Sequence, residues 1–203
     1  PEPLAPFVDL FVIGDGEETL QEITERWSRL KRESGISREE RIARLVSGLT
    51  YAYAPRFYEP EYLEDGRLAA IHRTRPDVPA EIKAATIQAD FDSIPIPTKP
   101  VMPYVECVHD RIAIEIMRGC PWQCRFCQST VIKRPLRFRS VDTILAAARE
   151  AYKQTGYDEI SVLSLSSSDY PDFEELVNRL AEEFQPLGVS ISVPSLRVNE
   201  QFK

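Results

Sequence analysis

The stretch DRIAIEIMRGCPWQCRFCQ, residues 110–128, joins an apolar-rich run to a loop that holds three of the chain's four cysteines. The run is typical of a β-strand, and the loop places Cys120, Cys124 and Cys127 at the spacing Cys-x3-Cys-x2-Cys. A structural zinc ion takes four protein ligands, so three thiols are one too few. The loop therefore either takes a fourth ligand from elsewhere or holds a metal with an open coordination position.

Strands and helices alternate on the carboxyl side of this loop. The sequence predicts, in order, a helix over 140–156, a strand over 157–167, a helix over 170–188 and a strand over 189–199. Ser140 is the expected N-cap of the first helix and Gly156 its C-terminal stop, while Pro171 suits the first turn of the second helix. The alternation predicts an α/β fold with a parallel sheet, in which chemistry gathers at the carboxyl ends of the strands.

The amino-terminal stretch FVDLFVIGDGEETLQEITERWSRLKRESG, residues 7–35, predicts a strand, a tight turn and a helix. The nearly continuous apolar run Phe7–Ile13 favours a strand buried on both faces of a parallel sheet. The expected apolar stripe of the helix consists of Leu20, Ile23, Trp27 and Leu30. A phosphate loop is disfavoured because Asp15, Glu17 and Glu18 lie where the helix start would have to accept an anion.

The middle of the chain reads as a connection. A short helix is expected around residues 38–47, followed by a β-hairpin that turns at Asp65-Gly66. His72 lies on the second arm of that hairpin and is expected to be a surface or cross-strand residue. The stretch DFDSIPIPTKPVMP, residues 90–103, is too rich in proline for a helix or a central strand and predicts an extended linker.

The overall composition of the chain indicates a cytoplasmic protein with reduced thiols. The 203 residues carry a formal net charge of −7, which disfavours general affinity for nucleic acid. No apolar run is long enough to span a bilayer, so no membrane partner is expected. One stretch is basic and lacks acidic residues, and it is either a solvated surface or a cationic rim around an anionic centre. Its charged residues are Arg118, Arg125, Lys133, Arg134, Arg137 and Arg139.

A zinc site would need Cys107 or His109 as its fourth ligand, and both precede the strand that ends at the loop. At about 3.3 Å per residue, that strand would carry them about 20 Å away. A disulfide is disfavoured in a reducing compartment. A 4Fe–4S cluster suits three thiolates better, because one iron then stays open to a substrate or cofactor.

The loop CPWQCRFC resembles the cluster-binding motif of radical S-adenosylmethionine (SAM) enzymes. The flanking stretches resemble the first half of the radical SAM domain in proteins with a preceding cobalamin-binding-like domain. They are VHDRIAIEIMRGCPWQCRFCQ, RPLRFRS, DEISVLSLSSSDYPDFEELV and SVPSLRVN. The family of that architecture is bacterial and largely uncharacterised, and methylthiotransferases are distant relatives.

The resemblance implies a fold and a division of the chain. The fold is the first half of a radical SAM partial (βα)6 barrel, preceded by the last strand–helix unit of a Rossmann-like α/β domain and by the hairpin and proline-rich linker. DLFVIGDGEE, residues 9–18, looks like that last unit. The expected segments are 1–34 for the end of the cobalamin-binding-like domain, 35–105 for the connection and 106–203 for the barrel half. The chain is thus expected to be a fragment that spans a domain junction.

The resemblance also implies residue roles. Cys120, Cys124 and Cys127 would each bind one iron, and the amino and carboxylate groups of SAM would chelate the fourth. Reduction of the cluster would cleave SAM to methionine and a 5′-deoxyadenosyl radical that acts on an unknown substrate, with RNA or protein as possibilities. The implied SAM contacts are Phe126, Ser166, Ser167, Ser168, Asp169, Ser195 and Arg197. The serines depart from the Gly-Gly-Glu-like motif of the family, and no catalytic residue is identified.

The implied partners are SAM and an electron donor such as flavodoxin or ferredoxin, and the reaction class is that of an iron–sulfur oxidoreductase or transferase. No Asp-x-His-x-x-Gly motif is present, so cobalamin is not supported by these residues, although the full-length protein could carry it. Two alternatives stay open. One is a zinc- or iron–sulfur-stabilised module that binds RNA or protein without catalysis, and the other is a domain that has lost its enzymatic role.

Overall fold

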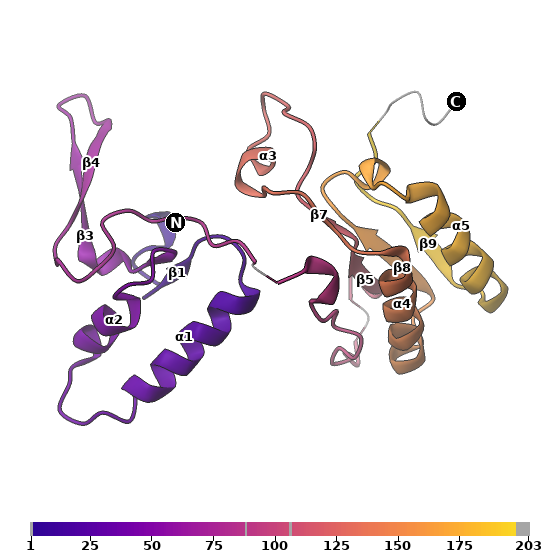
Figure 1. Cartoon of the computed structure of the whole chain (residues 1–203), viewed down its shortest axis with the longest axis horizontal. Coiled ribbons are helices and arrows are strands. Elements are labelled where there is room, and N and C mark those ends of the chain that lie inside the picture. Colours follow the sequence, from indigo (N-terminus) through magenta and orange to yellow (C-terminus); the bar gives the residue numbers. More distant parts are fainter. Residues whose placement is uncertain (1, 88, 106, 198–203) are drawn as a thin grey trace. The chain divides into compact units, whose positions relative to one another are not determined.

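The computed structural model describes residues 2–87, 89–105 and 107–197, which fall into two compact units (Figure 1). The units are Pro1–Gln88 and Ala89–Lys203. The packing boundary thus lies within the segment 35–105, which the sequence assigns to a connection. The assignment of 1–34 to a cobalamin-binding-like domain, of 35–105 to a connection and of 106–203 to a barrel half remains a prediction.

The amino-terminal unit contains two helices, a two-residue strand pair and a hairpin. Its elements are α1 (Glu17–Leu30), α2 (Arg38–Val46), β1 (Phe11–Val12), β2 (Ala52–Tyr53), β3 (Tyr58–Tyr62) and β4 (Leu68–Arg73), with short 3-10 turns at Glu2–Leu4 and Pro55–Phe57. Residues of α2 and the segment after it form the core. The core residues are Ile42, Ala43, Val46, Leu49, Ala52, Ala54, Phe57 and Val78.

The predicted strand over Phe7–Ile13 is wrong in both length and pairing. Only β1 is extended, and it pairs antiparallel with β2 rather than in a parallel sheet. Before β1, Glu2–Leu4 forms a 3-10 turn and residues 5–7 form a second turn, and Phe7 is 84% exposed. An apolar run alone did not distinguish a buried strand from an exposed turn.

Helix α1 confirms the helix that the sequence predicts within residues 7–35. Glu17 and Glu18 lie in its first turn and complement the helix dipole, and a carboxylate oxygen of Asp15 accepts a hydrogen bond from the Ile87 N–H at 3.1 Å. The predicted stripe is partly wrong, because Leu20 is 64% exposed and Thr19 is buried instead. Ile23 and Trp27 pack against the unit's core as the stripe predicts.

The hairpin and the second helix are confirmed. β3 and β4 pair antiparallel around the turn that contains Gly66. His72 is on the second arm, where its Nε2 lies 2.6 Å from the Glu61 carboxylate across the ladder. Ser37 caps α2 by accepting a hydrogen bond from the Glu40 N–H. His72 is therefore a cross-strand residue, as the sequence predicts.

The carboxy-terminal unit is an α/β layer with a parallel sheet, as the sequence predicts. The sheet order is β5-β8-β9, with β5 (Ile112–Glu115), β8 (Glu159–Leu163) and β9 (Ser190–Ser192). The helices α4 (Val141–Thr155) and α5 (Phe173–Phe184) pack against it (Figure 1). The fully buried side chains of the core include Ile114, Ile144, Leu145, Ile160, Val162, Leu176, Leu180 and Phe184. Each contributes about 1.5–3 kcal/mol by burial, so this layer is the rigid base of the unit.

The helix ends follow the sequence with one exception. The Ser140 hydroxyl accepts a hydrogen bond from the Thr143 N–H, and Gly156 closes α4 in the left-handed conformation at φ 69°. Pro171 precedes α5 rather than lying in its first turn, because Asp172 is the N-cap and Phe173 the first helical residue.

The predicted extended linker is only partly correct. Residues 94–105 contain no helix or strand, but Phe91–Ser93 forms a 3-10 turn and Phe91 is buried. The Arg139 guanidinium donates hydrogen bonds to the carbonyls of Phe91 and Ile94 and lies 4.4 Å from the centre of the Phe91 ring. Arg118 lies 5.0 Å from the centre of the same ring. The first residues of the proline-rich stretch are therefore part of the carboxy-terminal unit.

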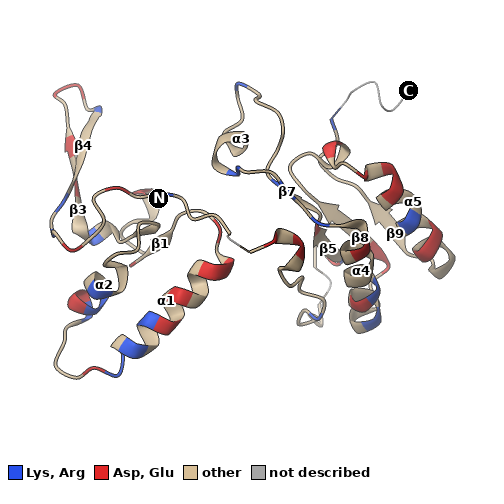
Figure 2. Cartoon of the chain, in the orientation of Figure 1, with Lys and Arg blue, Asp and Glu red and all other residues tan. Residues whose placement is uncertain are grey.

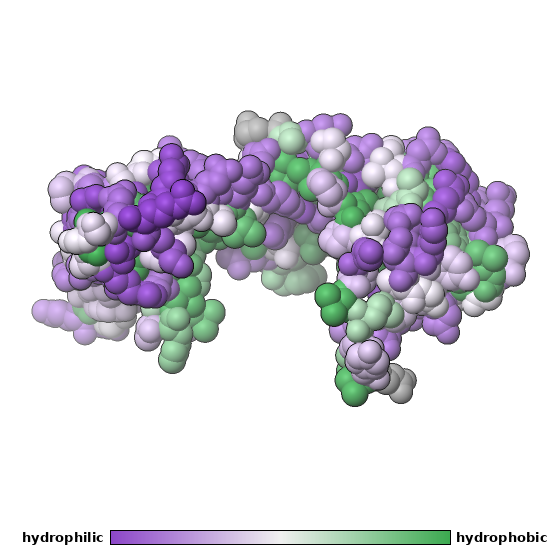
Figure 3. Space-filling view, turned by 90° about the horizontal axis from the view of Figure 1, so that it is seen from below, coloured by the Kyte–Doolittle hydropathy of each residue, from purple (hydrophilic) through white to green (hydrophobic). Residues whose placement is uncertain are grey.

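The surface is largely hydrophilic on the face that Figure 3 shows, with apolar residues in separate patches. None of the helices in the described part of the chain has both the length and the apolar character needed to cross a membrane.

Candidate functional site

The cysteine loop is closed at its base by a short strand pair that the sequence did not predict. The chain changes partner at Ile116, whose N–H donates to the Leu163 carbonyl of β8 while its carbonyl accepts from the Arg139 N–H. β6 (Met117–Arg118) then pairs antiparallel with β7 (Arg137–Phe138). The loop, residues 119–136, therefore leaves the carboxyl end of β5 and returns beside it.

Gly119 is required at the start of the loop. Its φ is +97°, and a Cβ built there would lie 2.7 Å from the Lys133 carbonyl oxygen and 3.2 Å from the Leu136 side chain. A larger residue would be strained in its backbone and would also clash with the returning chain. This glycine lets the two ends of the loop approach each other.

The three thiols lie on this loop in different environments. Cys120 is buried, while Cys124 and Cys127 are partly exposed, and none forms a disulfide. The Cys127 N–H donates to the Cys124 carbonyl at 2.9 Å, which makes one turn. Within the described residues, no three His, Cys, Asp or Glu side chains are grouped so that they could hold a metal ion. The three thiols therefore lie on one segment, but within the described residues they are not grouped as metal ligands.

The other cysteine and the nearby histidine belong to the opposite end of the strand. Cys107 and His109 precede β5, and His109 Nδ1 lies 3.0 Å from the Arg111 guanidinium. A fourth zinc ligand from either residue would have to reach across the length of β5.

The serines predicted as cofactor contacts form a turn after β8, residues 164–169, which is called the serine turn below. Ser166, Ser167 and Ser168 are buried, and the 3-10 helix Ser167–Asp169 ends the turn. The Ser164 and Ser167 hydroxyls are 2.9 Å apart. The Ser166 hydroxyl donates to Asp169 Oδ2 at 2.5 Å. The turn is thus rigid through its own hydrogen bonds.

Tyr170 fastens the serine turn to the returning end of the cysteine loop. Its hydroxyl donates to the Arg139 carbonyl at 2.6 Å, and its ring packs edge-on against Phe138 of β7. Burial, aided by nearby carboxylates such as Asp172, raises the pKa of Tyr170 to about 12. The phenol is therefore neutral over the physiological range.

Trp122 joins the cysteine loop to the other predicted contacts, and sequence reasoning missed it. Its indole N–H donates to Asp169 Oδ2 at 2.6 Å, and the Arg197 guanidinium lies 3.7 Å from the centre of its ring. The only available signal was an aromatic residue between Cys120 and Cys124, which by itself is also typical of packing.

The segment after β9 completes this group. Ser195 has a positive φ of 60°, its carbonyl accepts from the Ser167 N–H, and the Arg197 N–H donates to the Ser168 hydroxyl. Arg197 Nη1 is buried and has no hydrogen-bond partner within the described chain. A guanidinium nitrogen in that state is suited to an anionic ligand group, which forms strong charge-assisted hydrogen bonds.

Phe126 is the predicted contact that the structure does not bring into this group. Its side chain is 93% exposed. The predicted residues that do come together are Ser166, Ser167, Ser168, Asp169, Ser195 and Arg197, at the carboxyl side of β8 and β9.

A cavity of about 430 Å³ lies between the strand ends and the cysteine loop. It is lined by Glu115, Met117, Arg118, Gly119, Ser129, Lys133, Leu163, Ser164 and Leu165. Arg118 binds the Glu115 carboxylate through two hydrogen bonds of 2.9 and 2.8 Å. The cavity combines an apolar wall with charged groups at its edge, which is the usual make-up of a small-molecule site.

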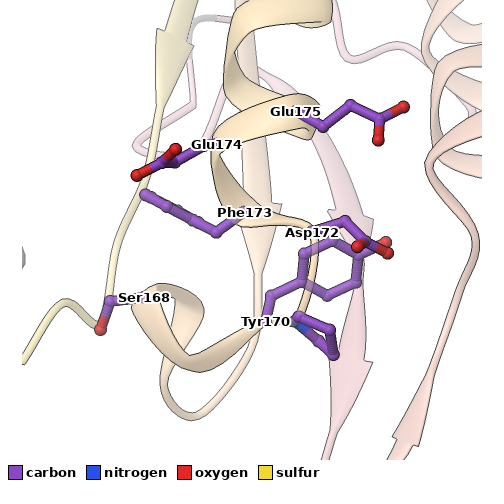
Figure 4. A pocket seen from close by; sticks show the side chains of 7 residues that line it. Ser168, Tyr170, Asp172, Phe173, Glu174 and Glu175 are labelled. Carbon is purple, nitrogen blue, oxygen red and sulfur yellow. The ribbon is translucent and has the colours of Figure 1, made fainter.

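A second cavity, of about 520 Å³, lies at the start of α5 (Figure 4). Asp172, Glu174 and Glu175 line it together with Ser168 and Tyr170. These carboxylates complement the positive end of the helix, and nothing in the described chain assigns a ligand to them.

The predicted cationic rim is smaller than the sequence suggests. Arg139 is 4% exposed and bonded to carbonyls, and Arg118 pairs with Glu115. The rest of the basic stretch stays near the loop surface, where Figure 2 shows positive and no negative residues around α3 (Ser129–Ile132) and β7. Arg125 and Lys133 are exposed there.

Two protein-family models match parts of this chain. Residues 114–203 match the radical SAM superfamily, and residues 1–55 match the amino-terminal region of radical SAM proteins. The two matches together support a radical SAM protein of the type that has a separate amino-terminal region. This superfamily is enzymatic and in general uses a 4Fe–4S cluster and SAM, and the cysteine loop lies inside the matched range.

One curated relative is an uncharacterized protein of Methanocaldococcus jannaschii. It is 38% identical over 86 residues, which cover 42% of this chain and 18% of that protein. The chain thus spans less than a fifth of that relative's length.

The residues present fit the cluster and SAM by their chemistry. Three free thiols on one loop are the donor set of a cluster with one open iron, and the unpartnered Arg197 Nη1 suits a carboxylate. Because the thiols do not converge, cluster binding must be accompanied by ordering of the loop.

Proposed function

We propose that the carboxy-terminal unit is the first half of a radical SAM partial barrel that binds a 4Fe–4S cluster and SAM. In this proposal the whole enzyme cleaves SAM reductively and modifies a substrate by radical chemistry. The observation that carries it is Trp122, which connects a three-thiol loop to Asp169 and Arg197 at the carboxyl side of the parallel strands. That is the edge where α/β folds bind ligands.

The cysteines hold the cluster in this proposal. Cys120, Cys124 and Cys127 each bind one iron, and the bound cluster supplies the electron that splits the S–C5′ bond of SAM. Because Cys120 is buried beside the strand end, it fixes the position of one of the three cluster ligands. The two outer thiols move toward it from the exposed part of the loop, since metal binding and local folding are coupled.

The serine turn and the segment after β9 hold the amino-acid part of SAM. Asp169 Oδ2 already accepts two hydrogen bonds, whereas Oδ1 accepts none from the described chain and is available to an ammonium group. Arg197 Nη1 is available to a carboxylate. Phe126, exposed in the described structure, contacts the adenine only after the loop has ordered.

The cavity beside Glu115 and Arg118 serves as the space over the reacting end of SAM. Its apolar wall of Met117, Leu163 and Leu165 excludes water from a radical, which protects it from side reactions. The substrate class remains RNA or protein, as the methylthiotransferase relatives suggest.

The electron comes from an acidic flavodoxin or ferredoxin in this proposal. Arg125 and Lys133 on the loop surface have no ion-pair partner within the described residues, and they are close in sequence to the cluster ligands. Complementary charge of this kind speeds association, so electron delivery should slow as salt concentration rises.

Anaerobic reconstitution of the intact protein with iron and sulfide tests the proposal. We expect about four irons per chain, an EPR signal after reduction, and a shift of that signal when SAM is added. Cys124→Ala should abolish the signal. Cys107→Ala is the matched control, because Cys107 is the one cysteine outside the loop, and it should leave iron and signal unchanged.

Stoichiometric zinc after purification, with no uptake of iron, would contradict the proposal and favour the zinc-stabilised binding module. A cluster that forms but never responds to SAM would instead favour an iron–sulfur module without radical chemistry. Both outcomes are distinguishable in the same preparation.

A further inference from the structure

Trp122 lies between two cluster ligands in sequence and between two predicted SAM contacts in space. Its indole N–H bonds to Asp169 Oδ2 at 2.6 Å, and its ring lies 3.7 Å below the Arg197 guanidinium. Asp169 follows β8 and Arg197 follows β9, so one side chain of the cysteine loop touches both neighbouring segments. In the proposed function Trp122 shows that the loop meets these segments, but it is given no task in ligand binding.

The two contacts leave a matched pair of polar atoms. Trp122 and Ser166 both occupy Oδ2 of Asp169, which leaves Oδ1 as the acceptor without a partner in the described chain. The ring below Arg197 holds the plane of the guanidinium, whose buried Nη1 has no partner there either. One acceptor for a cation and one donor for an anion, joined by a rigid ring, is an arrangement that suits an α-amino acid group.

We propose that Trp122 is a positioning residue that fixes Asp169 and Arg197 for the amino-acid part of SAM. The inference rests on the proposed function. The N–H holds the carboxylate and the ring holds the guanidinium, so the distance between them is set before the ligand arrives. A preorganised pair loses less conformational entropy on binding than two independent side chains.

The position of Trp122 also has a consequence for the loop. Because Trp122 lies between Cys120 and Cys124, the segment that carries two of the thiols also carries the contacts to Asp169 and Arg197. Ligand recognition by the serine turn and the shape of the cysteine loop are therefore linked by a single side chain.

The test compares SAM with 5′-methylthioadenosine, which has the same nucleoside but lacks the amino-acid group. Dissociation constants are measured by equilibrium dialysis on iron-loaded intact protein. Trp122→Phe keeps the ring and loses the N–H, and it should weaken SAM binding about tenfold. Trp122→Leu loses both and should weaken it about fiftyfold. Methylthioadenosine binding should change less than about twofold in either variant, because it has no ammonium or carboxylate to position.

Trp27→Phe is the matched control, since Trp27 is the other tryptophan of the chain and packs against the amino-terminal core. In the Trp27→Phe background, SAM should change the fluorescence of Trp122 and methylthioadenosine should not. Iron content should equal that of the wild type in both Trp122 variants.

Three results would overturn the inference. Equal weakening of SAM and methylthioadenosine would mean that Trp122 only supports the loop, and so would loss of iron in Trp122→Phe. Unchanged SAM binding in that variant would remove the role altogether. A wild-type protein that binds iron but no SAM would instead overturn the proposed function, and the inference with it.

Discussion

The cysteine loop and the serine turn follow neighbouring strands of the same parallel sheet, yet they differ in what completes them. The serine turn satisfies three of its four serine hydroxyls internally, through the Ser164–Ser167 pair and the Ser166–Asp169 hydrogen bond, and the Ser168 hydroxyl accepts from the Arg197 N–H. The cysteine loop is held at its base by β6 and β7, contains the Cys124–Cys127 turn and the short helix α3, and leaves its thiols apart. Hydroxyls bond to one another and thiols do so only weakly, so in the proposed function the chain itself completes the serine turn and a metal completes the cysteine loop.

Hydrogen exchange should give the largest contrast between the two regions. Loading the cluster should slow amide exchange in residues 120–127 by about 100-fold or more, because three metal–thiolate bonds order a segment that has a single internal backbone hydrogen bond among the described residues. The serine turn, residues 164–169, should change less than about threefold. Mass spectrometry of protein with and without iron measures both at once. Equal protection in the two regions would show that the loop was already ordered without metal.

High pH should weaken the connection between the two regions. The pKa of Tyr170 is raised from 10.0 to about 12 by burial, so the neutral phenol is favoured in the folded state. Stability from this group is complete below pH 10 and is lost as pH rises from about 10 to about 12, because the unfolded chain ionises first. The expected loss is about 2 kcal/mol at the upper end.

Urea unfolding at several pH values checks this. Tyr170→Phe should be about 1 kcal/mol less stable at neutral pH, since it loses the hydrogen bond to the Arg139 carbonyl, and its stability should fall less steeply above pH 10. A variant that follows the wild type throughout that range would rule out Tyr170 as the cause.

The elements of the carboxy-terminal unit were predictable because their signals are local. Ser140 and Gly156 delimit α4, and the apolar periodicity of α5 and the strands places the core. The parallel pairing of the sheet follows from the alternation of strands and helices. The serine turn and Arg197 were reached through the resemblance to radical SAM domains, and the structure brings them together.

What sequence reasoning missed depends on long-range partners. The run Phe7–Ile13 looked like a buried strand, but strand pairing is decided by the distant Ala52–Tyr53. Arg139 belongs to a basic stretch that the sequence places at the surface, but its guanidinium donates hydrogen bonds to the carbonyls of Phe91 and Ile94. Trp122 gave no signal because its partner Asp169 is 47 residues away.

Gly119→Ala should separate the shape of the cysteine loop from its ligands. The variant keeps every thiol, but its Cβ would lie 2.7 Å from the Lys133 carbonyl at a backbone φ of +97°. We expect iron loading to fall about tenfold because the ends of the loop can no longer approach each other. Gly156→Ala is the matched control, since it has a positive φ of 69° and open space around the added carbon.

Iron and sulfide analysis after reconstitution measures the effect, and circular dichroism monitors the total helix content. Full iron loading in Gly119→Ala would mean that the loop can bind the cluster without its closed base. A drop in both glycine variants would point to general instability instead.

Ser166→Ala should have the smallest effect, and it probes the serine turn rather than the cysteine loop. The hydroxyl donates to Asp169 Oδ2 at 2.5 Å, and Trp122 donates to the same oxygen. With Trp122 still in place, Asp169 keeps one of its two hydrogen-bond donors, so SAM binding should weaken only about fourfold. The double variant Ser166→Ala/Trp122→Phe loses both donors, and its SAM binding should weaken by more than the product of the two single effects. Equilibrium dialysis with SAM on the iron-loaded variants completes this cycle. A purely additive result would mean that the two donors act on Asp169 independently, and that the rigidity of the serine turn does not depend on the loop that it faces.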